Sequence, residues 1–119
     1  MKHEIMWWMS RITIMLTSLA LSFSLAASAY AADITMGSGG NLVFEPNEIT
    51  ISAGDTVTFT NGDLPPHNVM VEGHPELSHS DLAFAAGDSF DVTFPDPGDY
   101  NFQCDPHAGA GMKGVIHVS

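Results

Sequence analysis

The residues with the clearest chemical potential lie close together near the C-terminus, where Cys104, His107 and Met112 form a Cys-x2-His-x4-Met pattern. A strand-like run ends at the cysteine, and a glycine-rich loop carries the other two side chains. Such a loop, stiffened by Pro106, can curl a second and a third ligand around a thiolate. Thiolate, imidazole and thioether groups bind soft and borderline metal ions, so this stretch predicts a metal site.

A metal held by one thiolate needs another strong ligand, and His67 is the candidate. It follows Pro65-Pro66 at the start of an expected strand. Two imidazoles, a thiolate and a weak axial thioether form the ligand set of a blue-copper site. Structural zinc also accepts His and Cys, but usually in a closed site of four strong ligands, in which methionine is an odd member. Each residue also has an ordinary alternative, namely an inert core cysteine, a gap-filling methionine or a histidine in a turn.

The start of the 119-residue chain has the layout of a secretory signal. Lys2 and Arg11 precede an apolar run of 14 residues, 12–25, after which Ala29-Tyr30-Ala31 fits the small-x-small cleavage rule. A retained membrane anchor is the alternative, but this run is shorter than the roughly 20 residues that span a bilayer. We therefore predict a cleaved signal peptide over residues 1–31 and one exported domain over residues 32–119.

The predicted mature domain is strongly acidic, because Lys113 is its single base against 13 Asp and Glu, a net charge of −12. Nucleic acid and anionic membrane surfaces are therefore poor partners. The acids form no run of like charge, which suits solubility as well as the steering of a cationic partner. A domain of 88 residues often needs an extra constraint, and Cys104 has no disulfide partner within the chain. A metal is therefore the leading candidate for that constraint.

Short runs with alternating apolar residues follow one another between turn residues, and none has the 3.6-residue period of a major helix. This pattern predicts an all-β fold, a sandwich of seven or eight strands. The expected strands are residues 34–36, 42–44, 48–52, 56–60, 68–71, 89–94, 99–104 and 114–118. Residues 74–88 are the least strand-like part, and we expect a loop there with at most one helical turn at residues 76–79.

Alternation also assigns the faces of these strands, because successive side chains point to opposite sides of a sheet. Tyr100, Phe102 and Cys104 share a parity, so the thiol is expected to project inward from the last residue of a core strand. His117 should point outward, toward solvent. The other residues expected to point inward are Ile49, Ile51, Val57, Phe59, Val69, Val71, Phe90, Val92, Phe94, Ile116 and Val118.

Several longer motifs accompany the metal pattern. They are Met36-Gly-Ser38 leading to Leu42-Val-Phe-Glu-Pro46, Ile49-Thr-Ile-Ser-Ala-Gly-Asp-Thr-Val57, Pro66-His-Asn-Val69, Leu77-Ser-His-Ser-Asp-Leu-Ala-Phe-Ala-Ala-Gly87 and Cys104-Asp-Pro-His-Ala-Gly-Ala-Gly-Met112. With these motifs the chain resembles the plastocyanins, a family of small blue-copper proteins with the cupredoxin fold, and most of all those of cyanobacteria. The resemblance covers nearly all of residues 32–119 and implies a Greek-key β-sandwich with one copper ion, Cu(I) or Cu(II), at one pole.

By that resemblance, His67 and His107 bind copper through ring nitrogens, Cys104 binds as thiolate, and Met112 makes a long axial contact. Asn68 is expected to hold the two ligand-bearing loops together by hydrogen bonding. An apolar patch around the exposed edge of the second histidine is where electrons are expected to enter or leave. The residues that match this patch are Leu42, Pro66, Gly109 and Ala110.

One position departs from the family pattern. Plastocyanins commonly have an aromatic residue, usually tyrosine, directly before the ligand cysteine, whereas this chain has Gln103. The acidic docking site associated with that aromatic residue is therefore not implied here. Acids that could still form a negative flank are Asp63, Glu72, Glu76 and Asp81.

The resemblance implies a monomeric electron carrier, not an enzyme, that takes electrons from cytochrome f and passes them to photosystem I in the thylakoid lumen. Its contact with these membrane complexes would be transient and peripheral. The alternative is a periplasmic cupredoxin that donates electrons to a respiratory oxidase or reductase. A copper oxidase or nitrite reductase would need a further metal cluster or domain. A copper store or carrier is disfavoured because residues 32–119 hold only three methionines, Met36, Met70 and Met112.

A second metal site is a weaker hypothesis. His74, Glu76 and His79 lie within one expected loop and could in principle bind an ion together. A loop with two histidines is more often ordinary surface, so we expect no second site there.

Overall fold

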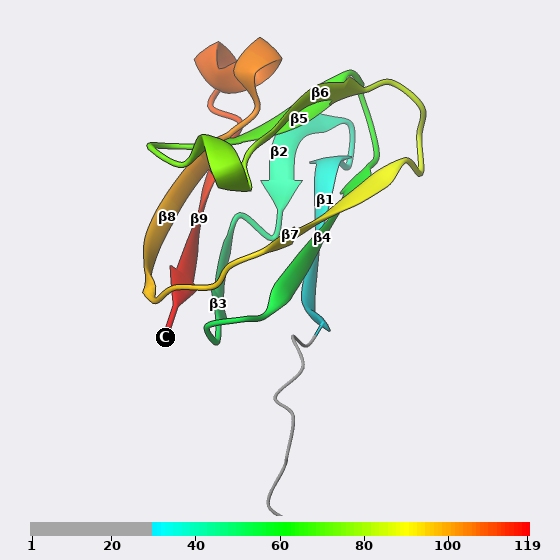
Figure 1. Cartoon of the computed structure of the whole chain (residues 1–119). Coiled ribbons are helices and arrows are strands. Elements are labelled where there is room, and N and C mark those ends of the chain that lie inside the picture. Colours follow the sequence, from blue (N-terminus) through cyan, green and yellow to red (C-terminus); the bar gives the residue numbers. More distant parts are fainter. Residues whose placement is uncertain (1–29) are drawn as a thin grey trace, which may run out of the picture.

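The computed structural model describes residues 30–119, so nearly all of the predicted signal peptide lies outside the described residues. Figure 1 shows two packed β-sheets with a short helix at one end. The strand order is β2-β1-β4-β7 in one sheet and β3-β9-β8-β5-β6 in the other. The strands are β1 (Tyr30–Ser38), β2 (Asn41–Glu45), β3 (Glu48–Ile51), β4 (Thr56–Asn61), β5 (His67–Val71), β6 (His79–Ala83), β7 (Ser89–Thr93), β8 (Gly98–Gln103) and β9 (Lys113–Val118). The predicted all-β sandwich is confirmed.

The prediction of a loop over residues 74–88 is wrong for β6, the strand that raises the count within residues 30–119 to nine. The sequence of β6, HSDLA, has no regular alternation of apolar and polar residues, so a period of two does not reveal it. It forms an edge strand by antiparallel pairing with β5, and the register shifts between His67 and Val69. Tertiary pairing therefore overrides a weak local signal.

Two short 3-10 helices complete the described chain. The first, η1 (Pro75–Leu77), lies where a single helical turn was expected. The second, η2 (Asp105–Ala110), occupies the segment that was expected to be an irregular loop after Cys104. Neither is long and apolar enough to cross a membrane, and the described residues contain no helix that is.

The space between the two sheets is filled by apolar side chains from both. The rings of Phe44 and Phe102 meet edge to face with centroids 4.7 Å apart, and Phe59 packs on Phe102 at 5.7 Å. Of the residues expected to point inward, all are buried except Ile49 and Phe90, which are partly buried and pack against the core. Burying one such large side chain contributes about 1.5–3 kcal/mol, so this core holds the strand ends in place.

Strand pairing brings the predicted ligands to one end of the sandwich. The strands β5 and β8 are antiparallel, with Met70 opposite Gln103, so the start of β5 lies beside the end of β8. His67 is the first residue of β5, and Cys104 directly follows the last residue of β8. Since Lys113 pairs with Gln103, the end of the segment before β9 lies at the same place. Figure 1 shows η2 (orange) at this end, which we call the ligand pole.

The two ends of the described chain lie at the opposite pole. Tyr30 pairs with Thr56 at the start of β4, while His67 follows the end of β4. The main-chain N–H of Ser119 donates to the Ile51 carbonyl at 2.9 Å, and the Ala53 N–H donates to the Ser119 carbonyl at 3.0 Å. The C-terminus is therefore held in the sheet, far from η2 (Figure 1).

His117 points outward from β9, as alternation predicts, and its side chain is partly exposed between two exposed carboxylates. Its Nδ1 lies 2.6 Å from Asp99 Oδ1 and its Nε2 lies 2.7 Å from Glu48 Oε1. The hydrogen bonds to Asp99 and Glu48 raise the pKa of His117. The protonated ring can donate to both carboxylates at once, so it links β3, β9 and β8 on the outer face of the sheet.

Candidate metal centre

Three of the predicted ligands converge at the ligand pole. The Nδ1 atom of His107 lies 3.4 Å from Cys104 Sγ, and the Nδ1 atom of His67 lies 3.8 Å from the same sulfur. His67 and Cys104 are fully buried and His107 is partly buried. Donor atoms of all three lie within 4.8 Å of one another, close enough to bind a single ion.

The hypothesis of a second metal site finds no support in the described part of the chain. Within residues 30–119 only one group of three or more His, Cys, Asp or Glu donors lies close enough to hold an ion. His74 instead bonds Glu76 at 2.8 Å, and the His79 ring stacks on Phe90 with centroids 3.7 Å apart. These histidines have structural contacts of their own.

The loop between Cys104 and Met112 is closed by main-chain hydrogen bonds. The His107 N–H donates to the Cys104 carbonyl at 3.1 Å, and the Met112 N–H donates to the His107 carbonyl at 3.3 Å. The Cys104 N–H donates in turn to the Met112 carbonyl at 3.1 Å. Gly111 has a φ of +88°, a left-handed conformation that favours glycine. The helix η2 thus returns the chain to Cys104 and leaves Met112 fully buried beside the start of β9.

The ring of His67 is oriented by a main-chain carbonyl that sequence reasoning missed. Its Nε2 lies 2.6 Å from the carbonyl oxygen of Asp63. Because a carbonyl only accepts hydrogen bonds, Nε2 must carry the proton, and in the neutral ring Nδ1 then presents its lone pair. That lone pair lies on the side of Cys104 Sγ, where a metal ion would be bound.

Asn68, the residue after the first histidine, joins three segments around the site. Its Oδ1 accepts the main-chain N–H of Asp105 at 2.9 Å, and its Nδ2 donates to the Ser80 carbonyl at 3.2 Å. The side chain is buried, so these bonds are shielded from water. They connect β5 with the segment after Cys104 and with β6.

The electrostatic environment of the site favours neutral side chains in the absence of an ion. Burial raises the pKa of the Cys104 thiol, while hydrogen bonds from the main chain of Asn68 and His107 act in the opposite direction. Burial, together with the nearby His67, lowers the pKa of His107. A bound cation would compensate the thiolate charge that burial disfavours. Two imidazole nitrogens, one thiolate and an adjacent thioether fit copper better than a closed zinc site.

The comparison with known protein families agrees with this donor set. Residues 31–119 match the family model described as copper binding proteins, plastocyanin/azurin family. The chain belongs to this family. It is 42% identical over 113 residues to the chloroplastic plastocyanin of Physcomitrium patens, covering 87% of this chain and 67% of that one. It is 41% identical over 117 residues to the plastocyanin of Prochlorothrix hollandica, covering 92% and 88%.

Solved structures of the plastocyanin/azurin family share the fold. The oxidized plastocyanin of Dryopteris crassirhizoma superposes with a TM-score of 0.65 at 34% identity, covering 73% of this chain and 99% of that one. The cupredoxin fold is thereby confirmed. As a member of the family, the chain is a copper protein that carries electrons and is not an enzyme.

The residues expected in the apolar patch differ in their exposure. Gly109 and Ala110 are exposed on η2, whereas Leu42 and Pro66 are only half-buried at the edge of the core. Sequence reasoning missed Leu64, which is 49% exposed and lies two residues before Pro66. Its φ of +56° is unusual for a residue other than glycine. The available signal was a leucine in the turn sequence NGDLPP, where apolar side chains have no strand to bury them.

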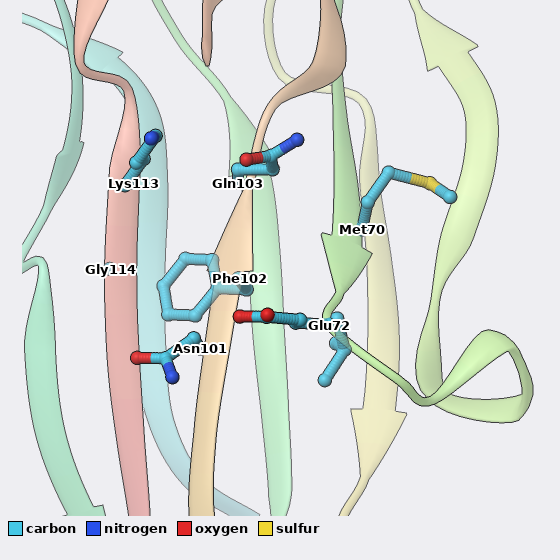
Figure 2. A pocket seen from close by; sticks show the side chains of 8 residues that line it. Met70, Glu72, Asn101, Phe102, Gln103, Lys113 and Gly114 are labelled. Carbon is cyan, nitrogen blue, oxygen red and sulfur yellow. The ribbon is translucent and has the colours of Figure 1, made fainter.

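Gln103, the position that departs from the plastocyanin pattern, lies in a shallow hollow on the outer face of β5, β8 and β9. Figure 2 shows Lys113, Gln103 and Met70 in one row across the three strands, with Glu72 in the next row. The hollow has a volume of about 630 Å³. The Gln103 side chain donates to Asp105 Oδ1 at 3.1 Å. One base, Lys113, and one acid, Glu72, line the hollow, so it is not uniformly acidic.

Proposed function

We propose that the protein carries single electrons from cytochrome f to photosystem I on the lumenal side of the thylakoid membrane. Membership of the plastocyanin/azurin family supports this role. The observation that carries it is the buried thiol of Cys104 between the Nδ1 atoms of two histidines, 3.4 and 3.8 Å away. Such a donor set is suited to a copper ion that changes oxidation state without changing its ligands.

In this proposal each ligand has a defined part. His67 and His107 would hold copper through Nδ1, Cys104 would hold it as thiolate, and Met112 would contribute its thioether sulfur as a weak ligand. Copper, when bound, supplies the one-electron redox chemistry. The protein's part is to hold the donors still, because His67 is fixed by the Asp63 carbonyl and the loop from Cys104 to Met112 is closed by its own hydrogen bonds. Asn68 adds a bond between the two ligand-bearing segments.

We also propose that electrons pass through the η2 side of the ligand pole. His107 is the only ligand that is not fully buried, and its helix carries the exposed Gly109 and Ala110. We assign Leu42 and Pro66 to the same patch, and the exposed Leu64, two residues before Pro66, is a further candidate for it. The hollow beside Gln103 has mixed charge, so it has a smaller role in docking.

Export by a cleaved signal peptide is part of the same proposal. Strand β1 begins at Tyr30, so cleavage after Ala31 would remove its first two residues. Pairing with β4 continues from Ala32 opposite Val57 to Met36 opposite Asn61, so the strand would remain in the sheet. The core residues Ile34 and Met36 lie in the retained part.

The absorption spectrum of the purified protein tests the proposed centre. Addition of Cu(II) is expected to give an intense blue colour, because charge transfers from the Cys104 thiolate to the metal in a blue-copper site. Electron spin resonance of the same sample should show a single Cu(II) species with the narrow hyperfine splitting of such a site. A colourless protein that binds zinc at the same residues would show that the centre is structural.

The docking surface is tested by adding one charge to it. Replacing Ala110 by glutamate is expected to slow electron transfer to photosystem I by about tenfold or more, because the contact would desolvate the new carboxylate. Ala53→Glu is the matched control, since it adds the same charge to an exposed alanine at the opposite pole. Flash-induced oxidation of the copper protein by photosystem I measures both. Equal rates for both variants would place the docking surface elsewhere.

A further inference from the structure

The Asp63 residue makes three hydrogen bonds that meet around His67. Its main-chain N–H donates to the Gly37 carbonyl at 2.9 Å, and its own carbonyl accepts from His67 Nε2 at 2.6 Å. Its carboxylate Oδ2 accepts the main-chain N–H of Gly40 at 2.9 Å. The first two bonds use the main chain and are open to any residue at this position. The bond to Gly40 requires a side chain of the length of aspartate that ends in a hydrogen-bond acceptor.

The contact with Gly40 joins two turns at the ligand pole. Gly40 lies in the tight turn between β1 and β2, where Ser38 pairs with Asn41. Asp63 lies in the loop between β4 and β5, directly before the exposed Leu64. The start of this loop is held to β1, because the Gly62 N–H donates to the Met36 carbonyl at 2.9 Å and the Asp63 N–H donates to the Gly37 carbonyl. The carboxylate bond adds a second restraint, from Asp63 to the turn that follows β1.

We propose that Asp63 is a positioning residue for the metal centre. Its carboxylate accepts the Gly40 N–H and thereby holds in place the Asp63 main-chain carbonyl, which orients the His67 ring. This inference rests on the proposed role of His67 as a copper ligand. Fixing the Asp63 carbonyl fixes the proton on Nε2, and that keeps Nδ1 free to bind the metal. The bridge thus acts on the ligand through one main-chain group.

The ordinary alternative is a solvated surface acid that caps a turn. Asp55 is such a residue, since its Oδ2 accepts the Ser52 N–H at 2.9 Å in the turn before β4. The two aspartates thus make the same kind of bond at opposite ends of one strand. Only Asp63 also offers its carbonyl to a ring nitrogen of a proposed ligand. Asp55 therefore serves as a matched control.

The His67 Nε2–H proton reports directly on this bridge. Its exchange with water can be followed by nuclear magnetic resonance in the metal-free protein and in the diamagnetic Cu(I) protein. Asp63→Ala is expected to speed this exchange about fivefold or more, the effect of losing one hydrogen bond. Asp63→Asn should restore slow exchange, because an amide oxygen can accept from Gly40. Asp55→Ala should leave the exchange unchanged.

In the Cu(II) protein, Asp63→Ala is also expected to shift the hyperfine splitting in electron spin resonance and to lower copper affinity about tenfold, as loss of outer-sphere support commonly does. Exchange in Asp63→Ala equal to that of the unmodified protein would overturn the proposal. So would an equal acceleration in Asp55→Ala, which would indicate general loosening. A failure of the copper assignment is distinguishable, because the unmodified protein would then not turn blue, whereas the metal-free exchange measurement needs no copper.

Discussion

Replacement of Cys104 by serine is expected to abolish the blue colour and to remove most of the stabilisation that copper gives the fold. The thiolate is the source of the visible band, and serine oxygen is a poor ligand for copper in this setting. Ligand binding at a free concentration 1,000 times the dissociation constant stabilises a protein by about 4 kcal/mol. Thermal unfolding with and without copper measures this increment in both proteins.

Comparing the unfolding of each protein with and without copper separates the role of Cys104 as a metal ligand from its role as a core residue. Cys104 is fully buried and belongs to the hydrophobic core, so the serine variant loses some stability even without metal. If the cysteine were only a core residue, copper would raise the unfolding temperature of the Cys104→Ser variant as much as that of the unmodified protein. The expected result is a normal increment for the unmodified protein and nearly none for the variant.

Replacement of Gly37 by alanine is expected to lower the free energy of unfolding by about 2–4 kcal/mol and to disturb the copper spectrum. Gly37 has a φ of +84°, and an added Cβ would overlap the carbonyl oxygen of Asp63. It would also lie 2.8 Å from His67 Nε2, so the methyl group would displace the hydrogen bond that orients this ligand. Urea unfolding of the metal-free protein and the absorption spectrum of the Cu(II) protein measure the two effects.

Gly54→Ala is the matched control for this prediction. Gly54 has a similar φ of +90°, but nothing lies within 4 Å of the position that its Cβ would take. The free energy of unfolding of the Gly54→Ala variant should therefore fall only by the strain of a left-handed alanine, about 1 kcal/mol. Its copper spectrum should be unchanged. Equal losses in both variants would mean that backbone conformation, and not the close approach to Asp63 and His67, makes Gly37 necessary.

The strands that could be predicted are those whose side chains alternate between core and solvent. In β4, for example, Val57 and Phe59 are buried between half-buried threonines, so the period of two is visible in the sequence. In β6 only Ala83 is buried, and the pattern is absent. That strand depends on the edge of β5 for its hydrogen bonds, which local sequence does not encode.

The metal centre was predictable to a different depth at each residue. Cys104, His107 and Met112 are close in sequence, so one short loop carries most of the site. His67 could be proposed from its position after Pro65-Pro66 at the start of an expected strand, and the antiparallel pairing of β5 with β8 brings it to Cys104. The carbonyl of Asp63 could not be predicted, because main-chain groups carry no residue signature and their direction depends on the turn that holds them. The same reason applies to the exposure of Leu64, which follows from that turn.

The separation of the ligand pole from the C-terminus has a practical consequence for attaching the protein to other objects. Ser119 is held beside Ile51 and Ala53, at the end of the sandwich opposite η2 (Figure 1). A linker added after Ser119 would tether the molecule to an electrode or to a fused redox enzyme with the copper end facing away from the tether. If electrons pass through the η2 side as proposed, they would enter or leave at the end that faces away from the tether. The topology of the fold would then set the orientation of the immobilised layer.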